Sequence, residues 1–214
     1  MRRLVLLVAI LGAGCASRAS APAGPSVPRA LAEALEADEY TRYELLAPET
    51  ARFRILYEVT AIAPGATVYF NPIRKGSVAS GERVTDRMAG EELRFEVVPG
   101  TQARRTGLPD AEAEVDYIRI HLARPVPPGG QVRLLIEKTY ADPKSYFAQG
   151  GEIVFERSLG VRRNGILLPA GYELLSCNVP SQVLSEPDGR ILVSFLNAGP
   201  EGVPLRLRAR RLPS

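Results

Sequence analysis

The chain carries a single histidine, His121, and this limits the chemistry that its side chains can perform. A zinc site of the His-Glu-x-x-His type needs two histidines, so the sequence excludes it. A Ser-His-Asp or Cys-His arrangement would have to use His121 as its base, and no Gly-x-Ser-x-Gly elbow is present. His121 stands between Ile120 and Leu122 in an alternating segment, which is typical of an exposed strand residue.

Cys177 is the only cysteine beyond the N-terminal segment. It follows Leu174, Leu175 and Ser176, and this apolar setting favours a buried, inert thiol over a nucleophile paired with His121.

The acidic residues from Asp110 to Asp116 alternate with Ala and Val. On a strand, the four carboxylates of this run (Asp110, Glu112, Glu114, Asp116) would share one face and could bind Ca²⁺ or serve an envelope hydrolase. The run lacks the glycine of a calcium loop, so a solvated edge is the simpler interpretation, and we predict no metal site.

Basic residues alternate in the same way near the end of the chain, where Arg206, Arg208 and Arg210 are separated by Leu207 and Ala209. Charged side chains commonly protect a sheet edge from unwanted pairing, and this is the simpler interpretation. The more specific hypothesis is that these arginines bind an anionic surface.

The segment 142–151, DPKSYFAQGG, is predicted to be an exposed loop. It places Tyr146 and Phe147 side by side, and adjacent aromatic residues on a loop are typical interface anchors. Arg157, Arg162 and Arg163 follow and could frame a partner-binding site. The alternative is that the two aromatic side chains fold back over the end of the domain. The absence of Trp disfavours carbohydrate stacking.

From about residue 40 onward, Gly and Pro recur every eight to twelve residues, and short segments with period-two alternation lie between them. This pattern predicts an all-β, antiparallel β-sandwich with one buried and one wet face per strand. The predicted strands cover 52–59, 93–97, 117–122, 132–137, 153–156, 172–179, 191–196 and 205–212.

The N-terminus has the layout of a secretory signal peptide: two arginines, an apolar run over 4–11, and small residues before Cys15. The stretch Leu11-Gly12-Ala13-Gly14-Cys15 resembles the lipobox of bacterial lipoproteins, which implies cleavage before Cys15 and acylation of Cys15. Gly12 stands where that family usually has Leu, and an ordinary signal peptide cut near Ala13 or Ala16 is the alternative.

We therefore divide the chain into a signal peptide (1–14), the lipidated Cys15 with an Ala/Ser/Pro-rich flexible tether (15–28), and a β-sandwich domain (29–214) led by a short helix over 29–37. The resemblance to lipoproteins implies an exported, lipid-anchored protein. Because Ser17 rather than Asp lies two residues beyond Cys15, it also implies the outer membrane, facing the periplasm.

The run 117–122, the turn from Pro125 to Gly130 and the strand Val132 to Tyr140 resemble the N-terminal β-sandwich of M1-type aminopeptidases. Two later segments, 168–172 and 176–178, are faintly similar to its later strands. The resemblance spans about 50–210 and implies a fold, but no activity, because it lies outside the peptidase's catalytic domain.

Without the signal-peptide arginines the formal net charge falls from +3 to +1, so nothing in it favours nucleic acid binding. We predict a membrane-anchored, non-catalytic binding or accessory domain of the cell envelope, with no cofactor and with an envelope protein as partner. The alternative is an envelope hydrolase that uses His121 or the Asp110–Asp116 carboxylates.

Overall fold

The computed structural model describes residues 38–199 and 201–213. The predicted signal peptide, the acylated Cys15, the tether and the helix over 29–37 lie outside the described residues.

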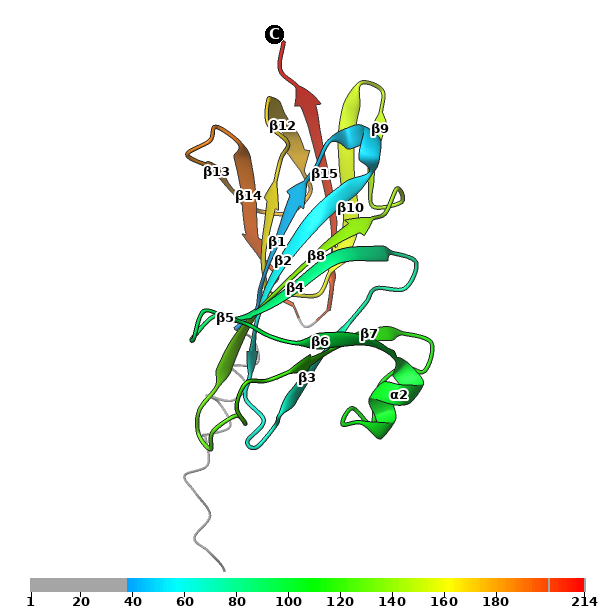
Figure 1. Ribbon diagram of the computed structural model, residues 1–214. Helices are drawn as coiled ribbons and strands as arrows, with labels where there is room; N and C mark the ends of the chain where they lie inside the picture. The colour runs from blue at the N-terminus through cyan, green and yellow to red at the C-terminus, as the bar shows by residue number, and fades with distance from the viewer. Residues whose placement is uncertain (1–37, 200, 214) are drawn as a thin grey trace, which may run out of the picture.

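The described chain forms three sheets (Figure 1). The large sheet has, in spatial order, β13 (Gln182–Ser185), β14 (Ile191–Leu196), β11 (Arg163–Leu167), β1 (Tyr40–Leu45), β2 (Arg52–Ala61), β8 (Val132–Ala141), β4 (Val78–Asp86) and β5 (Glu91–Glu92). The four-stranded sheet has β12 (Tyr172–Cys177), β15 (Val203–Arg211), β10 (Glu152–Leu159) and β9 (Tyr146–Gln149). The three-stranded sheet has β3 (Val68–Pro72), β7 (Asp116–His121) and β6 (Phe95–Pro99).

The predicted all-β class is confirmed. Strand pairing is antiparallel throughout the described residues except between β1 and β11, which are parallel. A 3₁₀ turn, η1 (Pro48–Thr50), joins β1 to β2, and the α-helix α2 (Gly100–Arg105) follows β6. The sequence analysis did not predict α2. Gly100 is required at its start, because a Cβ there would lie 1.7 Å from the carbonyl oxygen of Glu112.

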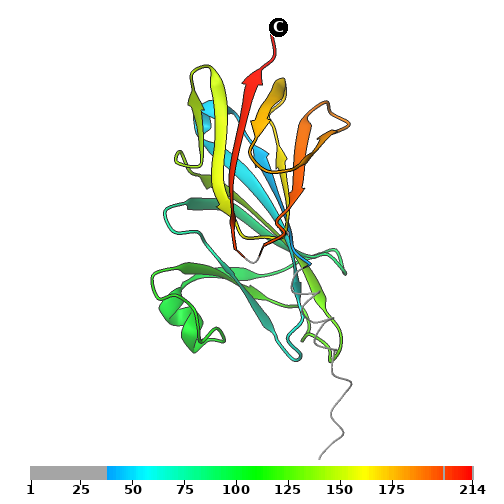
Figure 2. The ribbon, with the colours of Figure 1, turned by 180° about the vertical axis from the view of Figure 1, so that it is seen from behind.

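The two smaller sheets cover different ends of the large sheet, as Figures 1 and 2 show from opposite sides. We call the core under the four-stranded sheet the upper core. It contains Phe53, Ile55, Tyr140, Phe155 and Leu207, among others.

The lower core lies under the three-stranded sheet and contains Val59, Ile118, Ile120, Leu134 and Ile136, among others. In β2 and β8 the inward-facing positions are apolar along most of the strand, and this alternation forms both cores.

The strands β2 and β8 pair along ten residues each, from Arg52 opposite Ala141 to Ala61 opposite Val132. Both strands therefore contribute to the upper core at one end and to the lower core at the other. Tyr57 and Ile73 pack against both cores and mark the junction between them. Among the described residues, no helical segment combines the length and the apolar character that a membrane-spanning helix requires.

Candidate functional site

A cavity of about 340 Å³ lies at this junction, and all three sheets contribute to its wall. We call it the junction pocket. The large sheet supplies side chains from β1, β2 and β8, the three-stranded sheet supplies β3, and the four-stranded sheet supplies the end of β10. The residues that follow β3 and β10 close its rim, among them Arg74 and Gly160.

Lys138 projects into the interior from β8, between the inward-facing Ile136 and Tyr140. It is only 5% exposed. Its Nζ donates to Asn71 Oδ1 at 2.6 Å and to the carbonyl of Pro72 at 3.4 Å. Burial, reinforced by the positive charge of Arg157, lowers the pKa of Lys138 to about 8.

The ammonium group of Lys138 has no ion-pair partner among the described residues. Its two hydrogen-bond acceptors are the amide and carbonyl oxygens of Asn71 and Pro72, which carry no formal charge. The charge of Glu82 acts on Lys138 without forming an ion pair with it. A lysine this deeply buried without a carboxylate in contact is unusual, because desolvation of a charge is costly unless the charge is paired.

Arg157, which lies on β10, is the second buried cation of the pocket. Its Nη1 donates to Asp142 Oδ2 at 3.1 Å and to Ser145 Oγ at 3.4 Å. Its guanidinium lies 5.3 Å from the ring centre of Phe53 and 5.4 Å from that of Tyr140. These contacts fix the guanidinium at one wall of the pocket, and its charge is balanced by Asp142.

Asp142 follows β8 directly and is fixed by several donors. The backbone amides of Lys144 and Ser145 donate to its Oδ1, and the Ser145 hydroxyl donates to its Oδ2 at 2.7 Å. Burial alone would raise the pKa of Asp142, but the hydrogen bonds from Ser145 and the charge of Arg157 outweigh it and lower that pKa. Asp142 is therefore ionised at neutral pH and is the counter-ion of Arg157.

Tyrosine hydroxyls supply further polar groups at the pocket, from Tyr43, Tyr57, Tyr69 and Tyr140. Burial raises the pKa of Tyr57, and it raises the pKa of Tyr69 to about 12. These phenols therefore remain protonated at neutral pH and can donate hydrogen bonds. Tyr140 Oη accepts a hydrogen bond from the backbone amide of Arg74 at 3.1 Å, which ties the segment after β3 to β8.

The charges that line the junction pocket are all positive. Arg74, Lys138 and Arg157 contribute to its wall, and the described residues contribute no carboxylate to it. Arg74 and Arg157 also line a neighbouring hollow of about 490 Å³, which includes Glu156 and Arg206. The polar side chains and the aromatic rings of the junction pocket can hold a small molecule by hydrogen bonds, charge and apolar contact.

The structure contradicts the prediction that Tyr146 and Phe147 lie on an exposed loop. Tyr146 begins β9, is fully buried in the upper core, and donates its hydroxyl to the carbonyl of Leu46 at 2.8 Å. Phe147 is half-buried on the same strand. The prediction of an exposed loop was wrong because Tyr146 has an inward-facing position in a short hairpin that turns at Gly150 and Gly151.

The arginines expected to frame that loop are dispersed. Arg157 lines the junction pocket, whereas Arg162 is exposed before β11. Arg163 begins β11, where it forms an ion pair with Asp38 and donates to the carbonyl of Glu39 at 3.1 Å. These residues therefore form no common site with Tyr146 and Phe147.

Arg206, Arg208 and Arg210 lie on the exposed face of β15, as the alternation predicted. Each forms an ion pair with a glutamate of a neighbouring strand, namely Glu156, Glu152 and Glu173 in that order. We call these three arginines the arginine face. Because every arginine has an acidic partner, the face carries little excess positive charge.

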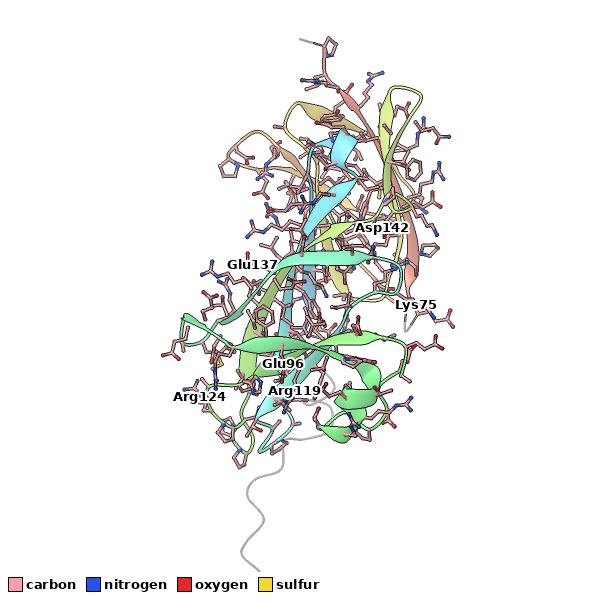
Figure 3. All side chains as sticks on the ribbon, turned by 45° about the vertical axis from the view of Figure 1, so that its right-hand side comes forward. Lys75, Glu96, Arg119, Arg124, Glu137 and Asp142 are labelled. Carbon is pink, nitrogen blue, oxygen red and sulfur yellow. The ribbon has the colours of Figure 1, made fainter. Side chains whose placement is uncertain are left out.

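His121 and Cys177 lie in different sheets. His121 ends β7 in the three-stranded sheet, is partly exposed, and has Nε2 3.4 Å from Glu96 Oε1. Arg119 donates to the same oxygen at 2.7 Å, and Figure 3 labels Arg119 and Glu96 in the lower half of the molecule, with Asp142 in the upper half. Cys177 ends β12 in the four-stranded sheet and packs against the upper core. The structure does not bring the two side chains together.

The carboxylates from Asp110 to Asp116 do not share a strand face. Residues 110–115 form turns and irregular structure after α2, and only Asp116 belongs to β7. Glu114 is highly exposed and pairs with Lys75 at 2.8 Å. The strand interpretation was wrong because Gly100 and Arg104 draw this segment against α2: Arg104 Nε donates to the carbonyl of Ala111 at 2.6 Å. Within the described residues, no three His, Cys, Asp or Glu side chains cluster as a metal site.

Sequence reasoning missed Lys138, although a signal for it was present. In the alternation of β8 the inward positions are 132, 134, 136, 138 and 140, and the fourth of these is a lysine among apolar residues. A charged residue at an inward position is the signal. Arg157 shows the same signal on β10, where Phe155 and Leu159 flank it at inward positions.

Comparison with known proteins gives a likeness of fold only. The chain matches no protein-family description and no curated protein. Among solved structures, it is similar to an M1 zinc metallopeptidase from Deinococcus radiodurans, with a TM-score of 0.48 and 13% identity over 80% of this chain. A mutant of that enzyme bound to a Tyr-Ser-Ala substrate gives a TM-score of 0.47 and 13% identity over 80% of this chain. In both cases the match covers 41% of the other chain.

Proposed function

We propose that this chain is a non-catalytic, membrane-anchored protein of the cell envelope that binds a small ligand in the junction pocket. The observation that carries the proposal is a cavity of about 340 Å³ with two buried cations, Lys138 and Arg157, in its wall. Burial of charge is costly, and ionisable groups perturbed by burial cluster at functional sites.

The pocket wall has the mixed polar and apolar character of a binding site. Tyr43, Tyr57 and Tyr69 offer ring faces, and Ile55 and Leu159 offer apolar contact. His121 and Cys177, the base and the nucleophile considered in the sequence analysis, belong to strands that do not line it.

The membrane anchor in this proposal rests on the sequence around Cys15. An acyl chain contributes about 0.8 kcal/mol for each buried CH₂, so two or more chains would hold the protein on the membrane. Replacing Cys15→Ser is expected to release the protein into the aqueous fraction, whereas Cys177→Ser leaves it on the membrane. Fractionation with mass spectrometry of the mature N-terminus measures this. Retention of Cys15→Ser on the membrane would refute the anchor.

The pocket itself is tested by adding bulk at its rim. Gly160 is at the pocket rim, and a Cβ added there meets no atom within 4 Å, so Gly160→Leu introduces bulk without a clash at the Cβ. Ala148→Leu adds bulk at an exposed position of β9 and is the matched control.

The measurement is native mass spectrometry of the full mature protein extracted in mild detergent. Wild type and Ala148→Leu are expected to carry a bound small molecule, and Gly160→Leu is expected to lose it. A wild-type protein that carries none, or a Gly160→Leu protein that keeps it, would contradict binding in this pocket.

A further inference from the structure

We infer that the ligand of the junction pocket is a small organic anion: a carboxylate or phosphate group attached to an apolar or aromatic body. This inference rests on the proposed function, and it assigns the ligand class from the charge and the donors of the pocket wall.

The first argument is charge. Arg74, Lys138 and Arg157 line the pocket, and no described carboxylate does. Asp142 forms an ion pair with Arg157 from outside this wall, at 3.1 Å. Glu82 acts on Lys138 through its charge, but among the described residues Lys138 forms no ion pair. An anion in the pocket would supply the missing counter-charge, and a cation would add to the repulsion.

The second argument is that the pocket wall has hydrogen-bond donors that a ligand oxygen could accept from. A lysine ammonium carries three N–H donors, and the described acceptors of Lys138 are Asn71 and Pro72. The third N–H has no oxygen acceptor among the described hydrogen bonds; Nζ lies 5.3 Å from the centre of the Tyr140 ring, a weaker partner that an anionic oxygen can replace. The hydroxyl of Tyr140 accepts from the backbone amide of Arg74, and its own proton has no acceptor among the described hydrogen bonds. Two donors of this kind suit an oxygen that accepts several hydrogen bonds.

The third argument concerns the rest of the wall. Besides the cations and polar groups such as Thr41, Asn71 and Ser158, the lining includes rings and methyl groups that suit an apolar body, from Tyr43, Ile55, Tyr57, Leu159 and Val161. Its volume of about 340 Å³ is at the small end of the range for small-molecule sites, about 300 to 1,000 Å³. Both properties favour a compact anion with an apolar part over a polymer.

The experiment uses the full mature protein in detergent and four probes that share a phenyl ring. Benzoate and phenyl phosphate carry the anion, and comparing them distinguishes a carboxylate from a phosphate site. Benzyl alcohol is the neutral probe and benzylamine is the cation. We expect one of the anions to bind at least about tenfold more tightly than benzyl alcohol in isothermal titration calorimetry, because a charged hydrogen bond contributes about a tenfold change or more.

Lys138→Met removes the unpaired ammonium and keeps most of the volume of the side chain. It is expected to weaken binding of that anion by at least about tenfold. Arg208→Met removes one exposed cation of the arginine face and is the matched control, with unchanged affinity expected. The control separates a local effect of Lys138 from the overall charge of the protein.

Three results would overturn the inference: equal binding of benzyl alcohol and the anions, preferred binding of benzylamine, or unchanged anion affinity in Lys138→Met. If a neutral or cationic probe binds and Gly160→Leu abolishes that binding, the junction pocket is a ligand site and only the assignment of an anion fails. If no probe binds and wild type carries no small molecule in native mass spectrometry, the proposed function fails as well.

Discussion

The arginine face of β15 and the junction pocket both present cations from alternating strands, but their surroundings differ. On β15, the side chains of Arg206, Arg208 and Arg210 are 47%, 46% and 58% exposed, and each has a glutamate partner. In the pocket, Lys138 and Arg157 are 5% and 7% exposed, and only Arg157 has a carboxylate partner.

This difference separates two uses of basic residues. Exposed, paired arginines contribute little to stability, and they leave little charge for a ligand. A buried cation without an ion-pair partner destabilises the fold unless something else compensates its charge, and this is the reason for the binding role that we propose for Lys138. The number of arginines in a segment is therefore a weaker indicator of a site than the burial and pairing of each one.

The largest effect is expected from Arg157→Met. Removing one partner of a buried ion pair leaves the other uncompensated, here Asp142, and such changes typically cost about 3–5 kcal/mol. Urea unfolding of the full mature chain measures the loss in the free energy of unfolding. A loss no larger than that of Arg208→Met would show that the two regions do not differ as described.

Lys138→Met is expected to increase the free energy of unfolding, whereas Arg157→Met decreases it. Burial lowers the pKa of Lys138 from 10.5 to about 8, so keeping the ammonium charged in the fold costs about 3 kcal/mol at neutral pH. The variant should therefore be more stable than wild type by up to that amount in urea unfolding, while it binds the anionic probe more weakly. A less stable variant would show that the hydrogen bonds to Asn71 and Pro72 outweigh the burial of the charge.

The gain from Lys138→Met should depend on pH. Between pH 8 and 10.5 the unfolded chain keeps the proton of Lys138 and the folded chain releases it, so the stability contribution of Lys138 rises with pH. Below pH 8 the penalty is fully present. The excess stability of the variant should therefore shrink from pH 8 to 10.5.

Comparing the two proteins at each pH removes the effect of groups that they share. These groups include Arg157 and Glu82, whose charges act on Lys138, and the neighbouring phenol of Tyr140. A constant difference in the free energy of unfolding across that pH range would contradict the assigned pKa.

The smallest effect is expected on the arginine face. Arg208 makes two hydrogen bonds to Glu152, at 2.7 and 2.9 Å, but its side chain is 46% exposed. A double-mutant cycle with Arg208→Met and Glu152→Gln should give a coupling energy below about 1 kcal/mol, and added salt should reduce it. A coupling energy of several kcal/mol would show that this exposed ion pair is as strong as the buried pair of Arg157 and Asp142.

The strands with clear alternation were predictable from the sequence. The predicted segments 52–59 and 132–137 correspond to β2 and β8, and both strands extend further than predicted. β4 was missed because its alternation is interrupted by a bulge between Ser80 and Arg83, where Gly81 adopts a φ of +64°.

The junction pocket was less predictable, because its wall comes from strands that are far apart in the sequence. Alternation alone shows that Lys138 faces inward, but it does not show that β3 and β10 meet there and leave a cavity. The ion pairs of the arginine face could not be predicted from the sequence for the same reason, because the partners Glu152 and Glu173 lie on other strands.

The ten-residue pairing of β2 with β8 has a consequence for how a ligand would act on the whole molecule. Each strand is continuous beneath both smaller sheets, and the pocket wall needs all three sheets to be in place. Local unfolding of either small sheet would therefore disrupt the junction pocket. A ligand bound in the pocket would suppress local unfolding of both small sheets. If the two sheets are coupled in this way, addition of one small molecule should slow amide hydrogen exchange in both β7 and β15.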